Sequence, residues 1–430
     1  MSSTSVAVDT LLRPSSVRAI VAACIGNTLE WYDFIVYTTF AVQISHAFFP
    51  AKNAFTSLIA TLITFGVGFF ARPFGAALLG AYADKAGRKT ALTLTVLLMA
   101  CGSFMIAVCP TAATIGIAAP IILFFARLLQ GFSAGGEIGG AIALLAEDAP
   151  VGRRAFYAAF QSTAQGAAFV LCGIVALIVT SCFSNNEVNA WAWRLPFLLG
   201  IAIAPVGFYI RRHIAEPELF TAQKCNAVQE MPIRLIFTKH LKSLLIGMGV
   251  VVVGTVVTYI TLYLPTYAHQ TLKISQSNGY TTLIIVGMIA MASPVAGVLA
   301  DRFSRSAVML LTVLCFIVYP YPAFYYLNHH ASGGTFIAIQ TSLAILMWMY
   351  VGPSSALLSE LFPTSVRSTG TALAYGLSVA IFGGFTPAII SVLVKYTGNN
   401  LSVAYWLMVS AVLSTVSLLA VQDRSRAELE

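Results

Sequence analysis

Apolar runs long enough to cross a bilayer recur along this chain from residue 18 to residue 421, and they constrain its fold more than any other feature. A transmembrane helix needs about 20 predominantly apolar residues. A soluble core does not explain so many such runs, and only 9% of the residues are charged, against about 25% in soluble domains. A transmembrane β-barrel is excluded because its segments would be about ten residues long and alternate in polarity. We predict an all-α polytopic membrane protein.

The apolar runs predict twelve transmembrane helices in two groups of six. One long polar stretch, 211–243, separates the groups and reads as a linker. We therefore expect an N-terminal tail at 1–17, a six-helix bundle at 18–210, the linker, a second bundle at 244–421 and a tail at 422–430. The predicted spans are 18–42, 55–82, 90–109, 114–146, 156–182, 192–210, 244–268, 279–300, 307–327, 335–358, 369–394 and 402–421.

The 24 Lys and Arg residues predict the orientation in the membrane. If the N-terminus is cytosolic, Lys52, Arg194, Lys273 and Lys395 lie outside, and nearly all the others lie in cytosolic segments. Cytosolic loops carry such an excess of positive charge, so we expect both termini and the linker in the cytosol. The net charge of +8 then reflects topology, and no nucleic-acid partner is expected.

Two loop motifs occur once in each half at nearly the same offset, which indicates a duplication. The segment from Gly80 to Lys89 is repeated at 297–305, and the segment from Glu147 to Arg154 is repeated at 360–367. Charges at neighbouring helix ends can hold one face closed in one state and release it in another. The simpler alternative is that they only anchor the spans. The predicted gating residues are Gly80, Asp84, Gly87, Arg88, Glu147, Arg154, Asp301, Arg302, Glu360 and Arg367.

A polar stripe runs along the first predicted span. Asn27, Glu30, Asp33 and Tyr37 fall within about a third of the helix circumference. A charge inside the hydrocarbon core costs at least ~2.5–3.5 kcal/mol, so it is rarely left without a partner or a function. The two carboxylates therefore predict a site inside the membrane.

Spans 2 and 4 supply the matching positive charges. Arg72 lies within span 2, and Arg127 shares one face of span 4 with Gln130 and Glu137. Another face of span 4 carries glycines at every fourth position, 131, 135 and 139, which lets a neighbouring helix approach closely. Spans 7–12 contain no Asp, Glu, Lys or Arg. We expect the charge chemistry in the N-terminal half, with aromatic and hydroxyl groups opposite.

Several stretches resemble the metabolite:proton symporter family of the major facilitator superfamily. This family imports small organic acids (citrate, tricarballylate, 2-oxoglutarate, shikimate) or proline and betaines with protons across bacterial inner membranes. The resemblance implies a multi-pass inner-membrane transporter with the major facilitator fold, closest to carriers of the citrate and tricarballylate type. The matching segments are 26–37, 71–75, 127–137, 193–197, 212–220 and 360–367.

Three acids facing two arginines would leave a net negative charge, so we expect one carboxyl to carry a proton. We predict that deprotonated Asp33 pairs with Arg127, and that protonation frees Arg127 for a substrate carboxylate. A permanent structural ion pair is the alternative. The predicted proton-coupling residues are Asp33, Glu30, Arg127 and Glu137. The predicted substrate-binding residues are Asn27, Tyr37, Arg72, Arg127, Gln130, Gln161, Gln165, Tyr259, Tyr263 and Tyr375.

The leading functional prediction is import of a small, anionic di- or tricarboxylate, such as citrate, with protons by alternating access. Guanidinium groups suit this substrate because they bind carboxylates bidentately. A proline or betaine symporter is the runner-up, and a proton-driven exporter is a third possibility. An enzyme is not expected, because HExxH, Walker and GxSxG motifs are lacking. We expect no metal and no cofactor beyond the proton as coupling ion, and a monomer in the lipid bilayer.

Overall fold

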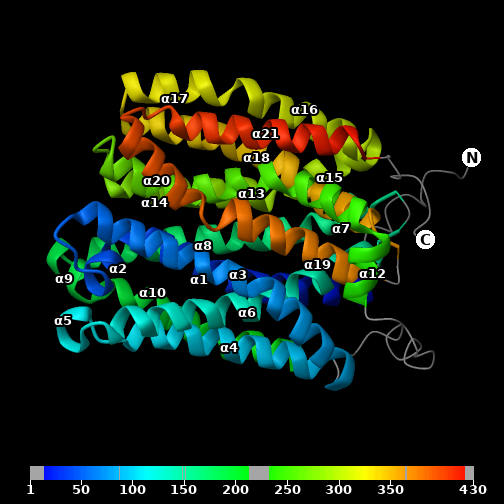
Figure 1. The fold of residues 1–430 in the computed structure, drawn as a ribbon, viewed down its shortest axis with the longest axis horizontal. Coiled ribbons are helices and arrows are strands. Elements are labelled where there is room, and N and C mark those ends of the chain that lie inside the picture. Colours follow the sequence, from blue (N-terminus) through cyan, green and yellow to red (C-terminus); the bar gives the residue numbers. More distant parts are fainter. Residues whose placement is uncertain are drawn as a thin grey trace, which may run out of the picture.

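The computed structural model describes residues 14–86, 88–147, 149–150, 152–212, 232–363 and 366–421. Figure 1 shows two parallel stacks of long helices, the first half of the chain below and the second half above. The long helices run between the same two ends of the molecule. One end, which we call the clamp end, carries the starts of α1 (Pro14–Thr39) and α4 (Arg88–Val108), the short α7 (Arg154–Ala158) and α12 (Pro232–Lys239).

Each predicted span coincides with helix in the described residues. The other helices of the first half are α2 (Ala41–Phe48), α3 (Ala54–Ala86), α5 (Ala112–Ile115), α6 (Ala118–Glu147), α8 (Phe160–Cys182), α9 (Asn185–Ala190), the 3₁₀ turn η1 (Ala192–Arg194) and α10 (Leu195–Arg212). Those of the second half are α13 (Leu241–Gln270), α14 (Gln276–Met291), α15 (Ser293–Arg302), α16 (Arg305–Val318), α17 (Pro320–His329), α18 (Gly333–Glu360), α19 (Arg367–Ser378), the π-helix η2 (Val379–Gly383), α20 (Thr386–Thr397) and α21 (Ser402–Leu419).

Several spans that we predicted as continuous are divided into shorter helices. In three of them a proline stands at the start of the last piece, in α15, α17 and α20. Proline lacks the N–H that would continue the ladder and its ring crowds the preceding turn, so the helix breaks there. Across the described residues, nine helical stretches are long and apolar enough to cross a membrane.

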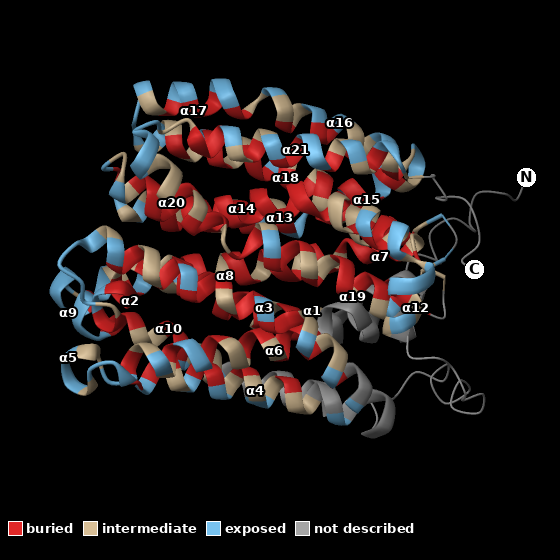
Figure 2. Ribbon diagram, viewed as in Figure 1, coloured by how far each residue is buried: buried red, intermediate tan, exposed pale blue. Residues whose placement is uncertain are grey.

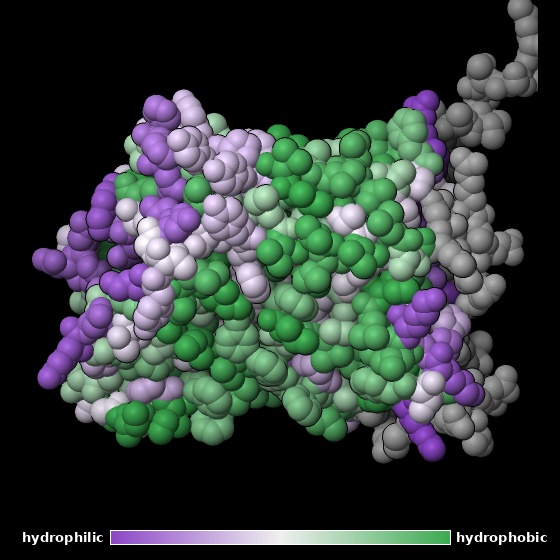
Figure 3. Space-filling view, turned by 45° about the horizontal axis from the view of Figure 1, so that its top comes forward, coloured by the Kyte–Doolittle hydropathy of each residue, from purple (hydrophilic) through white to green (hydrophobic). Residues whose placement is uncertain are grey.

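The surface has an apolar belt between two polar ends. Figure 3 shows hydrophobic side chains gathered over the middle of the visible face and hydrophilic ones toward both ends. In Figure 2 the buried residues concentrate where the two stacks face one another. This is the pattern of a helical bundle whose sides are covered by lipid and whose ends are in water.

Glycines let α3 and α6 pack at backbone contact. A Cβ built on Gly131 would lie 1.6 Å from the carbonyl oxygen of Gly68, and one on Gly135 would lie 1.9 Å from that of Arg72. The predicted close-packing face of span 4 is confirmed at these two positions. The close approach also brings the helix segments that carry Arg72 and Arg127 side by side.

Candidate functional site

A buried ion pair joins α1 and α3. Arg72 Nη2 donates to Glu30 Oε1 at 3.0 Å, and both side chains are almost completely buried. The Arg72 guanidinium also lies 4.8 Å from the Phe34 ring and 4.6 Å from the Phe69 ring. Opposite charge and the electron-rich faces of the rings both stabilise the cation away from water.

Arg127 reaches Asp33 only through two intermediate side chains. Its Nη1 donates to Gln130 Oε1 at 2.7 Å, and Gln130 Nε2 donates to Ser103 Oγ at 2.9 Å. Ser103 Oγ in turn donates to Asp33 Oδ2. Arg127 forms no ion pair with any carboxylate that the structure describes. We call this connection from α6 through α4 to α1 the relay.

The guanidinium of Arg127 is enclosed by aromatic rings. It lies 4.8 Å from Phe34, 4.4 Å from Tyr37 and 5.0 Å from Phe65. Phe34 therefore contacts both arginines. Nε and Nη2 of Arg127, like Nε and Nη1 of Arg72, have no hydrogen-bond partner among the described residues. Buried donors of this kind are costly, so their lack of a described partner calls for an explanation.

A cavity lies between the two halves, and we call it the central cavity. Tyr259 of α13 contributes to its wall and packs on the N-terminal half, with ring centroids 5.1 Å from Phe69 and 5.9 Å from Phe65. The Tyr259 hydroxyl is buried and has no described hydrogen-bond partner. The lining residues are Trp31, Gln161, Ser162, Gln165, Val251, Gly254, Thr255, Thr258, Tyr259, Tyr350, Val351, Ser354, Ser355, Leu358 and Tyr375.

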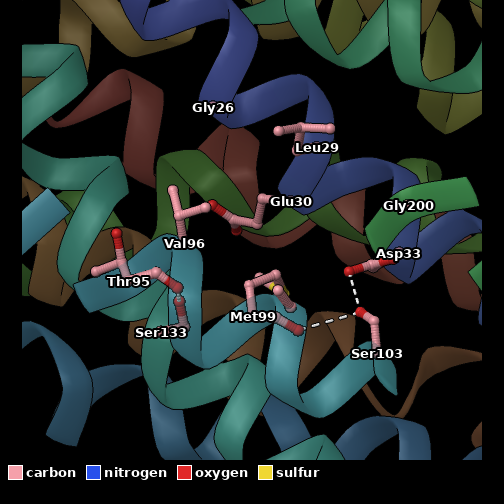
Figure 4. Close-up of a pocket in the computed structure, with 11 residues that line it drawn as sticks. Gly26, Leu29, Glu30, Asp33, Thr95, Val96, Met99, Ser103, Ser133 and Gly200 are labelled. Atoms are coloured by element: carbon pink, nitrogen blue, oxygen red, sulfur yellow. Dashed lines mark hydrogen bonds between the residues drawn. The ribbon is translucent and has the colours of Figure 1, made fainter. Parts of the chain in front are cut away.

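A second pocket lies inside the N-terminal half, between α1, α4, α6 and α10, and we call it the inner pocket. Figure 4 shows Glu30 and Asp33 at its α1 wall and Ser103 facing Asp33 from α4. Among the residues that the structure describes, no arginine, lysine or residue of the second half lines it. The lining residues are Gly26, Leu29, Glu30, Asp33, Thr95, Val96, Met99, Ala100, Ser103, Ser133 and Gly200.

Charged residues connect the halves at the clamp end. Glu360 of α18 accepts from Arg305 of α16 and from Arg154 Nη1 of α7 at 3.4 Å. Arg305 also pairs with Asp301 at 2.9 Å. The Asp301 carboxylate receives the backbone N–H groups of Ala155 at 3.1 Å and Phe156 at 3.0 Å. We call these contacts, which join α7 of the first half to α15, α16 and α18 of the second, the clamp.

A family model described as "Sugar (and other) transporter" matches residues 19–229 and 218–423. The chain belongs to this transporter family. A citrate-proton symporter from Klebsiella pneumoniae is 36% identical over 422 residues, which cover 96% of this chain and 94% of the relative. A proline/betaine transporter from Escherichia coli strain K12 is 33% identical over 427 residues, covering 96% and 85%.

Solved structures show the same fold. A proton:xylose symporter of the major facilitator superfamily, bound to 6-bromo-6-deoxy-D-glucose, aligns with a TM-score of 0.72 and 17% identity over 94% of each chain. The predicted major facilitator fold is thereby confirmed. So is the predicted resemblance, since citrate-proton symporters are among the relatives of this transporter.

The predicted substrate-binding residues separate into two groups. Gln161, Gln165, Tyr259 and Tyr375 line the central cavity, but the other six do not. Most of those six use their polar atoms within the protein. Asn27 donates to the Gln161 carbonyl at 3.0 Å, and Tyr37 donates to the Thr61 carbonyl at 3.1 Å. Tyr263 accepts from Ser391 at 2.6 Å. Arg72 forms the ion pair with Glu30, and Arg127 and Gln130 belong to the relay.

The predicted gating residues also divide. Arg154, Asp301 and Glu360 belong to the clamp, but Arg302 is exposed and lies beside Phe303 at 5.8 Å. Arg305, which we did not predict, supplies the guanidinium instead. Arg367 is buried and donates to the Ser359 carbonyl at 3.2 Å. The predicted sites at Gly80, Asp84, Gly87, Arg88, Glu137 and Glu147 lie outside the residues whose side chains the structure describes.

Sequence reasoning also missed Ser103 and Trp31. Ser103 is the central member of the relay, and Trp31 lines the central cavity. Ser103 lies in a largely apolar span, which was a usable signal. A hydroxyl there can equally bond its own helix, however, as Ser103 also does to the Met99 carbonyl at 3.1 Å.

The clamp can be tested without a substrate. In Asp301→Ala, the amides of Ala155 and Phe156 lose their acceptor, so we expect their hydrogen exchange to rise about tenfold or more, because exchange follows local opening. Mass spectrometry of the purified protein would measure this. Glu187→Ala is the control, since Glu187 caps only α9 at the opposite end. Equal exchange of α7 in wild type and Asp301→Ala would show that Asp301 does not hold this end.

Proposed function

We propose that this protein is a secondary transporter that imports a small organic carboxylate together with protons by alternating access, with both termini in the cytosol. The relay between Asp33 and Arg127 is the observation that carries this proposal. It connects the buried carboxyl of Asp33, which can hold a proton, to the buried Arg127, whose Nε and Nη2 have no hydrogen-bond partner among the described residues. The citrate-proton symporter relatives support the same chemistry.

Ser103 is the point at which a proton on Asp33 changes the relay. Its single hydroxyl hydrogen has two acceptors within reach, Asp33 Oδ2 and the Met99 carbonyl. Ionised Asp33 takes this hydrogen. Protonated Asp33 becomes the donor, and Ser103 then turns its hydrogen to Met99 while it accepts from Asp33 and Gln130. Protonation thus reverses one hydrogen bond and removes the negative charge nearest the relay.

The substrate carboxylate binds in the central cavity, at the wall formed by Gln161, Gln165 and Tyr259. Arg72 lies behind this wall, and the Phe69 ring, which contacts both Arg72 and Tyr259, connects it to the wall. A carboxylate on the substrate attracts the guanidinium, and Asp33 protonation offsets the charge that the substrate brings in. Loading both together keeps the site close to neutral, which favours the state that can reorient across the membrane.

A proline or betaine symporter is the second candidate, and the aromatic lining favours it. Trp31, Tyr259, Tyr350 and Tyr375 all line the central cavity. Aromatic faces bind quaternary ammonium groups by cation–π attraction. The proline/betaine transporters among the relatives support this reading, whereas the two buried arginines support the carboxylate.

Uptake into proteoliposomes decides between the two substrates. With an imposed inward pH gradient, we expect labelled citrate to accumulate above its equilibrium level. Unlabelled tricarballylate and 2-oxoglutarate should compete with it, and proline and betaine should not. Collapse of the gradient with a protonophore is the control and should abolish accumulation. Gradient-driven uptake of proline or betaine without any carboxylate would overturn the carboxylate proposal in favour of the osmolyte one.

A further inference from the structure

The inner pocket and the central cavity are formed by different sets of helices. Its walls come from α1, α4, α6 and α10 alone, whereas the central cavity involves α1, α8, α13, α18 and α19. The two spaces share no lining residue. Asp33 lines only the inner pocket, so its proton and the substrate have separate surroundings within the same half of the protein.

The chemistry of the inner pocket excludes an anionic substrate. Two carboxylates, Glu30 and Asp33, face it together with Thr95, Ser103 and Ser133, and no cation is among its described lining residues. A second carboxylate-bearing molecule would be repelled there, because like charges in a poorly screened space repel strongly. Water and hydronium ions fit it, since hydroxyl and carboxylate oxygens provide hydrogen-bond partners.

One oxygen of Asp33 is open toward this pocket. Oδ2 accepts from Ser103, while Oδ1 is buried and has no hydrogen-bond partner among the described residues. Gly200 of α10 leaves the space beside it, because a Cβ at that position would lie 2.9 Å from Oδ1. A glycine here keeps the carboxylate oxygen accessible to a water molecule.

The inner pocket also has a direction. Its lining extends along α1 from Asp33 back to Gly26, and along α4 from Ser103 back to Thr95. At 1.5 Å per residue these stretches are about 10–12 Å long. Both helices begin at the clamp end (Figure 1). The pocket therefore leads from Asp33 toward the clamp end.

We propose that the inner pocket is a water site through which Asp33 exchanges its proton toward the clamp end, separately from the substrate, and that Gly200 keeps this route open. This inference rests on the proposed function, because it takes Asp33 as the proton carrier. The titratable and charged groups described around Asp33 are Glu30 and Tyr32 on α1, Arg127 on α6, and Arg72 on α3, which pairs with Glu30. Of these, only Glu30 also lines the pocket.

Two variants narrow the pocket from different walls. Gly200→Ala adds a methyl group beside Asp33 Oδ1, and Ala100→Leu fills the pocket from α4. We expect both to slow proton-driven uptake about tenfold or more, while substrate counterflow at equal acidic pH stays near the wild-type rate. Counterflow exchanges substrate on a carrier that stays protonated, so it does not need the proton route.

Leu97→Phe is the matched control, because Leu97 lies on α4 with 56% of its surface exposed. Infrared difference spectra give a second measurement, since hydrogen–deuterium exchange of the Asp33 carboxyl should slow in Ala100→Leu and not in Leu97→Phe. Loss of driven uptake and counterflow together would overturn the inference, because the pocket would then serve the substrate path or the packing. Normal driven uptake in both variants would also overturn it.

Asp33→Asn separates these failures from a failure of the proposed function. If Asp33→Asn loses driven uptake while Gly200→Ala and Ala100→Leu keep it, only the inner pocket has been assigned wrongly. If Asp33→Asn itself keeps driven uptake, Asp33 is not the carrier, and the proposed coupling and this inference both fail.

Discussion

Asp33→Asn is expected to lower proton-driven uptake about 100-fold, the upper range of coupling between two bound ligands, while counterflow persists. Asparagine is nearly isosteric with aspartic acid and keeps the contact with Ser103, but it cannot release a proton. The relay is then locked in the form that corresponds to protonated Asp33. Substrate can still bind and cross, but the gradient no longer drives net accumulation.

Paired assays on one proteoliposome preparation measure this effect. Gradient-driven uptake and counterflow are recorded for wild type, Asp33→Asn and a control, Glu187→Gln. Glu187 is an exposed carboxylate that caps α9 through Ser184, so its removal should change neither rate. Driven uptake at the wild-type level in Asp33→Asn would refute the coupling role. Loss of both activities would assign Asp33 to substrate binding or folding instead.

Among single glycine-to-alanine substitutions at the described glycines, we expect Gly131→Ala to lower the free energy of unfolding the most. The added methyl group would meet the Gly68 carbonyl oxygen at 1.6 Å, a distance that neither backbone can accept without moving. Overpacking of an interior costs typically 1–3 kcal/mol and more where backbone must shift, so we expect a loss of about 3 kcal/mol. Separation of α3 from α6 would also move Arg72 and Arg127 apart, so transport should fall with stability.

Thermal unfolding of the purified protein in detergent, followed by fluorescence-detected gel filtration, measures this loss. Gly334→Ala is the matched control, because nothing lies within 4 Å of a Cβ at that position. We expect its midpoint to be unchanged. A Gly131→Ala variant as stable as Gly334→Ala would mean that α3 and α6 do not pack at backbone contact.

The sequence predicted features that depend on periodicity along one helix. Apolar run length located the spans, and the glycines of span 4 predicted the face that packs on α3. Periodicity does not reveal which side chain on a neighbouring helix meets a given face. For this reason we expected Asp33 against Arg127, whereas the structure places Glu30 with Arg72 and inserts Gln130 and Ser103 before Asp33.

Helix boundaries explain why Arg305 belongs to the clamp and the predicted Arg302 does not. Arg302 ends α15 and is exposed, while Ser304 caps α16 and Arg305 begins it. The chain turns at Ser304, so Arg305 returns toward Asp301 and Glu360 instead of pointing away. Serine is a favoured N-cap residue, and that signal was present in the sequence. The role of Glu360 as a shared partner was not, because it depends on packing across the two halves.

We expect the shared position of Glu360 to affect how fast this transporter can turn over. If the halves separate at the clamp end, we expect Glu360 to lose Arg154 and keep Arg305, and Asp301 to keep Arg305 as it loses the amides of α7. Neither acid is left as an uncompensated charge, which would cost several kcal/mol. The closed and open states can then differ little in free energy, and a modest difference in substrate affinity is enough to drive the cycle.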